Sequence, residues 1–134
     1  MATLNTLTVD YSKTRQQFGS PIGSFQVLQH RMVDTFMGCE QTKSMLYRGL
    51  CESKSVEEGE ADAVALSKTV HALKATVARY GKTIGEEAIQ LHGGIGMTDE
   101  LNIGHYVKRL MMINTTFGDG DFHQKKFNQL SYSV

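Results

Sequence analysis

The chain of 134 residues carries 14 basic and 14 acidic residues, so its formal net charge is zero. This balance argues against the strongly basic surface that binds nucleic acid or an anionic membrane. No apolar run is long enough to span a bilayer, and the first residues lack a signal-peptide pattern. We therefore expect one domain with its own hydrophobic core, no nucleic-acid partner, no membrane span and, if the protein is bacterial, a cytoplasmic location.

The first half of the chain has the apolar periodicity of amphipathic helices. A short helix is predicted from Leu4 to about Gln17, and residues 18–23 interrupt it because they include a proline and two glycines. Ser24 is predicted to cap a second, long helix. The polar residues 53–59 are predicted to connect this helix to the next one.

The second half continues with the same period. A long helix is predicted over residues 60–91, and the glycine-rich residues 92–96 end it. Thr98 is predicted to cap a helix that extends to about Thr116, and a short last helix is expected over residues 121–131. Together these elements predict an all-α fold, an antiparallel four-helix bundle with a short C-terminal helix.

Two motifs could contact a ligand. In the first, Arg15 precedes a turn that contains Phe18 and Gly19, and Phe25-Gln26 follows. An arginine beside such a turn can donate forked hydrogen bonds to phosphate. From the residues alone, a solvated arginine and an ordinary turn is the alternative interpretation.

The second motif runs from Gln90 to Gly96 and joins two predicted helices. Its glycines would let a ligand approach the backbone closely. No predicted strand precedes it, so it is not a dinucleotide-binding loop of the Rossmann type. An ordinary glycine-rich turn between helices is again the alternative.

The two motifs, their spacing and Val107-Lys108-Arg109 resemble the C-terminal helical domain of acyl-CoA dehydrogenases. The resemblance covers nearly the whole chain and implies that residues 1–134 form this domain, without the N-terminal α-domain and the middle β-domain. It also implies that the complete enzyme binds FAD, dehydrogenates acyl-CoA thioesters at the α,β position and passes electrons to an electron-transfer flavoprotein. The isolated chain is expected to be inactive and not to bind FAD by itself.

The resemblance also implies roles for individual residues in the flavin site. Arg15 would contact the FAD pyrophosphate, Phe18 would pack near the cofactor, and Gln26 would form a hydrogen bond with it. The adenosine side would be contacted by the second motif, at Gln90, Gly93 and Gly94.

The usual catalytic glutamate of the family has no counterpart here. Counting without gaps from Arg109 places Gly118 at its position, and glycine cannot abstract a proton. Asp119 is a weak substitute, displaced by one residue, and its alternative role is to cap the last helix. The chain therefore resembles a divergent or small subunit that lacks the glutamate. Some relatives carry the glutamate in an upstream helix, an alternative that the sequence leaves open.

Two functions from different classes remain after this comparison. The first is the FAD-contacting and oligomerisation domain of an acyl-CoA dehydrogenase; the second is a non-catalytic assembly subunit that completes the flavin site of a catalytic partner. The expected partners are further copies of the chain or a larger acyl-CoA dehydrogenase subunit. No metal site is predicted, because His92, His105 and His123 lack the spacing of metal ligands.

Overall fold

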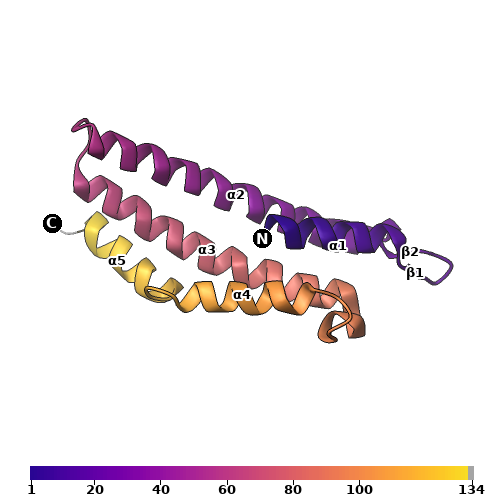
Figure 1. The fold of residues 1–134 in the computed structure, drawn as a ribbon. Coiled ribbons are helices and arrows are strands. Elements are labelled where there is room, and N and C mark those ends of the chain that lie inside the picture. Colours follow the sequence, from indigo (N-terminus) through magenta and orange to yellow (C-terminus); the bar gives the residue numbers. More distant parts are fainter. Residues whose placement is uncertain (133–134) are drawn as a thin grey trace. The chain divides into compact units, whose positions relative to one another are not determined.

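The computed structural model describes residues 1–132, and the all-α fold is confirmed (Figure 1). Short elements join the helices at two places: a two-stranded antiparallel hairpin with a 3-10 turn, and a second 3-10 segment. The elements are α1 (Ala2–Thr14), β1 (Gln16–Gln17), β2 (Ser20–Pro21), η1 (Ile22–Ser24), α2 (Gln26–Glu57), α3 (Ala63–His92), η2 (Gly93–Met97), α4 (Ile103–Thr115) and α5 (Gly120–Tyr132).

The chain folds as two compact units. Unit 1 comprises residues 1–39 and 80–112, and unit 2 comprises residues 40–79 and the chain from Ile113 onward. The long helices α2 and α3 contribute one part to each unit. Because every candidate flavin-contacting residue named above lies in unit 1, this unit determines whether those residues come together.

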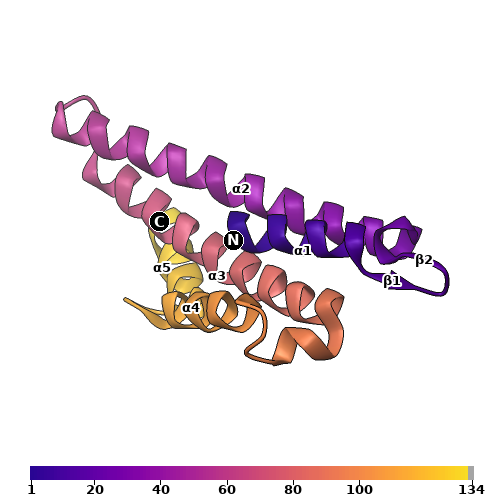
Figure 2. The same ribbon diagram turned by 45° about the vertical axis from the view of Figure 1, so that its right-hand side comes forward.

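Unit 1 brings together parts of four helices, α1, α2, α3 and α4. Figure 2 shows α1 lying along the N-terminal part of α2, where Thr35 donates a hydrogen bond to Asn5 at 2.8 Å. Arg31 of α2 pairs with Glu87 of α3 at 2.6 Å, and the hydrogen bond to Glu87 raises the pKa of Arg31. The buried core draws side chains from all four helices: Leu4, Cys39, Ile84, Ala88, Ile103 and Val107.

Small residues allow the helices within each unit to approach closely. In unit 1, a Cβ atom placed on Gly38 would lie 2.6 Å from the Tyr80 ring. In unit 2, a Cβ atom on Gly120 at the start of α5 would lie 2.8 Å from the Cβ of Ala78 in α3. A side chain at either glycine would therefore force the neighbouring residue to shift.

The start of the chain differs from the prediction in two ways. The first helix ends at Thr14 and not at Gln17, because Arg15 takes an extended conformation and the hairpin follows. Ser24 does not cap α2, which begins at Gln26. Its hydroxyl donates instead to the carbonyl of Pro21 at 2.7 Å, within the 3-10 turn.

Three other helix boundaries were predicted wrongly. Residues 53–57 continue α2, and the helix α3 starts later than predicted, where Asp62 accepts a hydrogen bond from the Val64 amide at 3.1 Å. Thr98 does not begin α4, which starts at Ile103. The Thr98 hydroxyl donates to the carbonyl of Ile95 at 2.9 Å and thereby closes η2.

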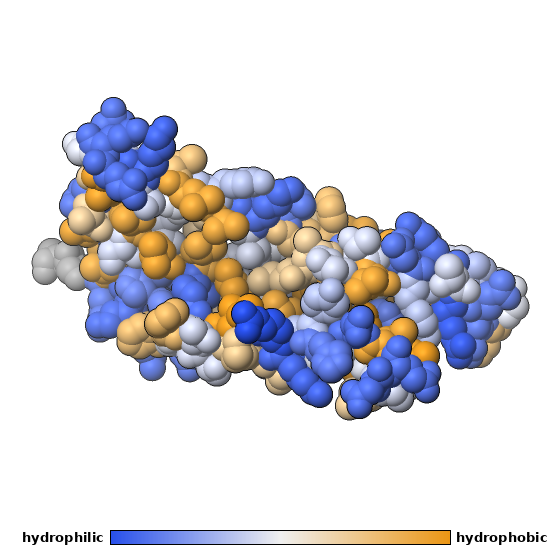
Figure 3. Space-filling model, in the orientation of Figure 1, coloured by the Kyte–Doolittle hydropathy of each residue, from blue (hydrophilic) through white to orange (hydrophobic). Residues whose placement is uncertain are grey.

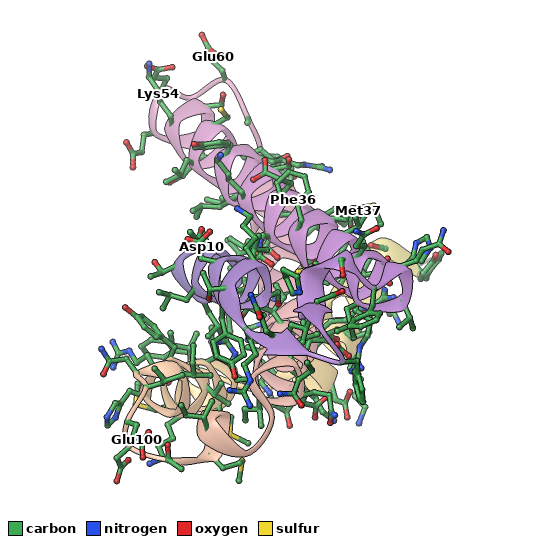
Figure 4. All side chains as sticks on the ribbon, turned by 90° about the vertical axis from the view of Figure 1, so that its right-hand side faces the viewer. Asp10, Phe36, Met37, Lys54, Glu60 and Glu100 are labelled. Carbon is green, nitrogen blue, oxygen red and sulfur yellow. The ribbon has the colours of Figure 1, made fainter. Side chains whose placement is uncertain are left out.

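Apolar side chains also reach the surface, where they lie among hydrophilic ones (Figure 3). Three of them share one face of α2, at the spacing that places side chains above one another on a helix: Val33, Phe36 and Met37 are all exposed, and the last two are labelled in Figure 4. No helix within residues 1–132 is both long and apolar enough to cross a membrane.

Candidate functional site

The hairpin after α1 presents an aromatic ring at its tip. Gln17 pairs with Ser20, and the two residues between them have positive φ, 55° at Phe18 and 79° at Gly19. Two consecutive residues of this kind form a type I′ turn. Phenylalanine adopts this conformation only at a cost in energy. The Phe18 ring is 93% exposed, and its one ring contact among residues 1–132 is an edge contact with Phe25 at 6.2 Å.

Arg15 lies at the junction of α1 and this hairpin. Its backbone is fixed on both sides, since its amide donates to the Tyr11 carbonyl and its carbonyl accepts from the Ile22 amide, each at 2.8 Å. Its side chain is exposed, and within residues 1–132 the guanidinium makes no hydrogen bond or ion pair. The backbone of Arg15 is therefore fixed by hydrogen bonds, while its guanidinium is free to bind an anionic ligand.

The 3-10 turn connects the hairpin to α2 by close backbone packing. A Cβ atom on Gly23 would lie 2.9 Å from the Ser12 carbonyl oxygen in α1, and Gln29 donates to the Gly23 carbonyl at 3.0 Å. Gln26 therefore begins α2 at a defined place beside the hairpin, with its side chain exposed.

The end of α3 has an open backbone. Gly93 has a φ of 62°, a conformation typical of the residue that ends a helix. Neither Gly93 nor Gly94 has any atom within 4 Å of the place where a Cβ atom would lie, and Gln90 is exposed one turn before. Gly96 differs, since a Cβ atom there would lie 2.9 Å from the His92 Cβ. The first two glycines are thus open to a ligand, and the third serves packing.

A stacked pair of rings brings the two motifs to the same end of unit 1. The Tyr11 and His92 rings lie 4.3 Å apart with an interplanar angle of 25°, and the Tyr11 hydroxyl lies 3.4 Å from the His92 carbonyl oxygen. Arg15 follows Tyr11 by four residues, a rise of about 6 Å along a helix, and Gly93 follows His92 directly. Figures 1 and 2 show the hairpin and the end of α3 at this end.

The turn before α5, in unit 2, holds the position that the resemblance gives to the catalytic glutamate. A Cβ atom on Gly118 would lie 2.6 Å from Phe122 and 3.2 Å from His123, and the φ of Gly118 is 106°. Asp119 accepts a hydrogen bond from the Phe122 amide at 2.8 Å, so it caps α5, as the alternative interpretation predicted. The turn has no room for a side chain at position 118.

Sequence reasoning missed three side chains that hold this turn. The His71 and His123 rings meet with their Nδ1 atoms 2.7 Å apart, and Lys74 donates to two carbonyls at the end of α4. No local motif could reveal a pair of histidines 52 residues apart; the only available signal was that His71 and Lys74 share a helix face. In the part of the chain that the structure describes, no group of three or more potential ligands could hold a metal ion.

Comparison with known proteins supports the interpretation drawn from the motifs. The family model of the acyl-CoA dehydrogenase C-terminal domain matches residues 1–126. The chain belongs to the acyl-CoA dehydrogenase family. Acyl-CoA dehydrogenase IpdE2 of Mycolicibacterium smegmatis is 39% identical over 103 residues, which are 77% of this chain and 29% of that protein. L-prolyl-[peptidyl-carrier protein] dehydrogenase of Serratia sp. (strain ATCC 39006) is 32% identical over 125 residues, which are 93% and 31%.

Solved structures of family members have the same fold. An FAD complex of PigA superposes with a TM-score of 0.82 at 28% identity, over 96% of this chain and 32% of that one. The ChsE4-ChsE5 complex of Mycobacterium tuberculosis superposes with a TM-score of 0.86 at 20% identity, over 99% and 35%. This acyl-CoA dehydrogenase domain spans about a third of the length of these two relatives. Of the two solved structures, one is an FAD complex and the other is a complex of two proteins.

Proposed function

We propose that this chain acts as the FAD-contacting C-terminal domain of a flavin-dependent acyl-CoA dehydrogenase, an enzyme that dehydrogenates acyl-CoA thioesters at the α,β position. The observation that carries the proposal is the Tyr11–His92 contact. It brings an unpaired arginine, an exposed aromatic ring and an open glycine backbone to one end of unit 1. Each of these groups is available to a ligand, as a cofactor site requires.

The two motifs suit different parts of FAD. The end of α3 carries the partial negative charge of a helix C-terminus, so Gln90 and Gly94 fit the uncharged adenosine better than the pyrophosphate. Arg15 supplies the positive charge and the forked donors that a pyrophosphate needs. FAD, when bound, would supply the hydride acceptor for the dehydrogenation, while Phe18 and Gln26 would hold it by contact and hydrogen bonding.

The cofactor proposal predicts a specific loss of affinity when Arg15 changes. We would join this chain to the N-terminal and middle domains of IpdE2, in place of that relative's own C-terminal domain, and titrate FAD by its fluorescence. Arg15→Gln should weaken FAD binding about tenfold or more, because charged hydrogen bonds contribute roughly 1.5–3 kcal/mol. Lys13→Gln is the matched control, since Lys13 is also exposed near the end of α1 and pairs only with Asp10 in the described structure. Equal affinities of the two variants would refute the role of Arg15.

The alternative is that the chain is a non-catalytic subunit that completes the flavin site of a catalytic partner. This role is favoured by the contrast between an open flavin-contact surface and a turn with no room for a base at Gly118. Co-expression with a larger acyl-CoA dehydrogenase relative distinguishes the two. A stable complex in which only the partner's glutamate is needed for activity would support the alternative; dehydrogenation without such a partner would exclude it.

We also propose that the chain associates through the exposed apolar face of α2 defined by Val33, Phe36 and Met37. Contiguous exposed apolar side chains of this kind are characteristic of association surfaces. Sedimentation should therefore show dimers or larger species, and Phe36→Ser should shift the distribution toward monomer. A wild-type chain that remains monomeric at high concentration would contradict this proposal.

A further inference from the structure

Three side chains hold the turn between α4 and α5 by hydrogen bonds: Lys74, Asp119 and His123. Lys74 of α3 donates to the carbonyls of Ile113, in the last turn of α4, at 3.0 Å and of Thr116, just after α4, at 2.8 Å. Asp119 caps α5 from the other side of the turn. Between them, the carbonyl of Phe117 lies 3.1 Å from the Nε2 atom of His123.

The hydrogen bonds of His123 determine where its protons lie. A carbonyl oxygen can only accept, so the Nε2 atom of His123 must carry a proton. The ring is buried, with 5% of its surface exposed, and in a neutral imidazole that carries its proton on Nε2 the Nδ1 atom can only accept. This Nδ1 lies 2.7 Å from the Nδ1 of His71. The proton between the two rings therefore belongs to His71, which must be the Nδ1–H tautomer.

The surroundings of the pair disfavour additional charge. Burial lowers the pKa of His71, and the nearby His123 and Lys126 lower it further. Lys74 lies one turn along α3 and is directed to the α4 carbonyls. The helix α2 also packs against this part of α3. Its Glu52 is hydrogen-bonded to Thr69 of α3 and forms an ion pair with Arg48. Two positively charged rings would place two N–H groups against each other at hydrogen-bond distance, an arrangement that cannot persist.

We propose that His71 and His123 are positioning residues that fix the Phe117–Gly118 turn through a single shared proton. While one Nδ1 atom is unprotonated, the pair holds the carbonyl of Phe117 and thereby keeps the Phe117 ring directed to solvent and position 118 closed. When both rings are charged, the pair separates and the turn is released. The proposal concerns the histidines and the turn alone, and it does not rest on flavin binding.

The first test is the tautomer of each ring, read from long-range proton–nitrogen correlation spectra of the 134-residue chain at about pH 8. We expect the Nδ1–H form at His71 and the Nε2–H form at His123, with the exposed His30 and His105 as internal references. The Nε2–H form at both histidines would overturn the proposal, because then no proton would lie between the rings.

Two variants of His71 separate the shared proton from mere packing. His71→Asn keeps an N–H donor near the place of Nδ1 but cannot titrate, whereas His71→Leu removes the donor. Exchange of the Gly118 and Phe122 amides should be about tenfold faster in the leucine variant and nearly unchanged in the asparagine variant.

The same amides provide a pH test that needs no destabilised variant. Between about pH 8 and about pH 5, exchange corrected for its intrinsic pH dependence should accelerate in the wild-type chain and stay constant in His71→Asn. Loss of helicity in the leucine variant would not affect this comparison. Identical pH profiles for wild type and His71→Asn would refute the positioning role.

Discussion

Two turns of this molecule contain the same dipeptide, and both residues of each dipeptide have positive φ. Phe18-Gly19 has φ values of 55° and 79°, and Phe117-Gly118 has φ values of 61° and 106°. Both phenylalanine rings are more than nine-tenths exposed. The glycines differ, since Gly19 has open space around it and Gly118 lies against Phe122 and His123.

The two turns are also held by different kinds of interaction. The Phe18 turn is held by backbone pairing between short strands, which leaves its side chains available. The Phe117 turn is held by Lys74, His123 and Asp119, whose side chains occupy the space around it. A phenylalanine whose backbone adopts the left-handed conformation costs energy, and such residues tend to occur at functional sites. We infer that the first turn keeps its strained conformation to contact a ligand, and that the second is closed at position 118, to which the resemblance gives the catalytic glutamate.

The largest expected effect is a difference in stability between substitutions at Gly118 and at Gly19. Gly118→Glu should destabilise the chain by about 3 kcal/mol, because it adds a clash with Phe122 to an unfavourable backbone conformation. Gly19→Glu is the matched control and should cost only about 1 kcal/mol, since its space is open. Urea unfolding of both variants measures the difference. Equal costs would show that position 118 is not closed, and Gly118→Glu could then be tried as a restored base.

The second prediction concerns the cap of α5. Asp119→Ala should lower the free energy of unfolding by about 1 kcal/mol, because the Phe122 amide loses its acceptor. Asp119→Asn keeps an acceptor oxygen and should be close to wild type. A catalytic rather than capping aspartate would reverse this pattern, with a stable alanine variant and an inactive asparagine variant.

The third prediction uses the strain at the hairpin tip. Phe18→Asn should raise the free energy of unfolding by up to about 1 kcal/mol, because asparagine tolerates the left-handed conformation better. In the fusion with IpdE2 domains, the same variant should weaken FAD binding through loss of the ring. A variant that is more stable and binds FAD as tightly as wild type would remove Phe18 from the site.

The smallest expected effect is the pH dependence of stability. The pKa of His71 is lower in the folded chain than the ordinary value of 6.5, so the unfolded chain takes up a proton first as the pH falls. The contribution of His71 is therefore complete above about 6.5 and is lost progressively toward the lower folded-state pKa. Urea unfolding at several pH values should show this loss in wild type and a weaker dependence in His71→Asn. A dependence of the same size in both would assign it to other groups.

The sequence allowed the helices and the glycine-containing breaks between them to be predicted, because a period of three to four residues and glycine-rich breaks are local signals. The flavin contacts assigned to two of these breaks remain a prediction. It did not allow the hairpin to be predicted, since strands of two residues show no alternation. The start of α4 was misplaced because Thr98 closes η2 through its hydroxyl. The His71–His123 pair was missed because only the fold brings those residues together. Asp119 was recognisable as a cap because it directly precedes a helix.

We propose above all that this domain supplies flavin contacts but needs further domains to bind FAD. The measurement that tests it most directly is the flavin absorbance retained after gel filtration with excess FAD, for the 134-residue chain alone and for its fusion with the IpdE2 domains. We predict a colourless chain and a yellow fusion. A chain that retains flavin by itself, or a folded fusion that retains none, would contradict the claim.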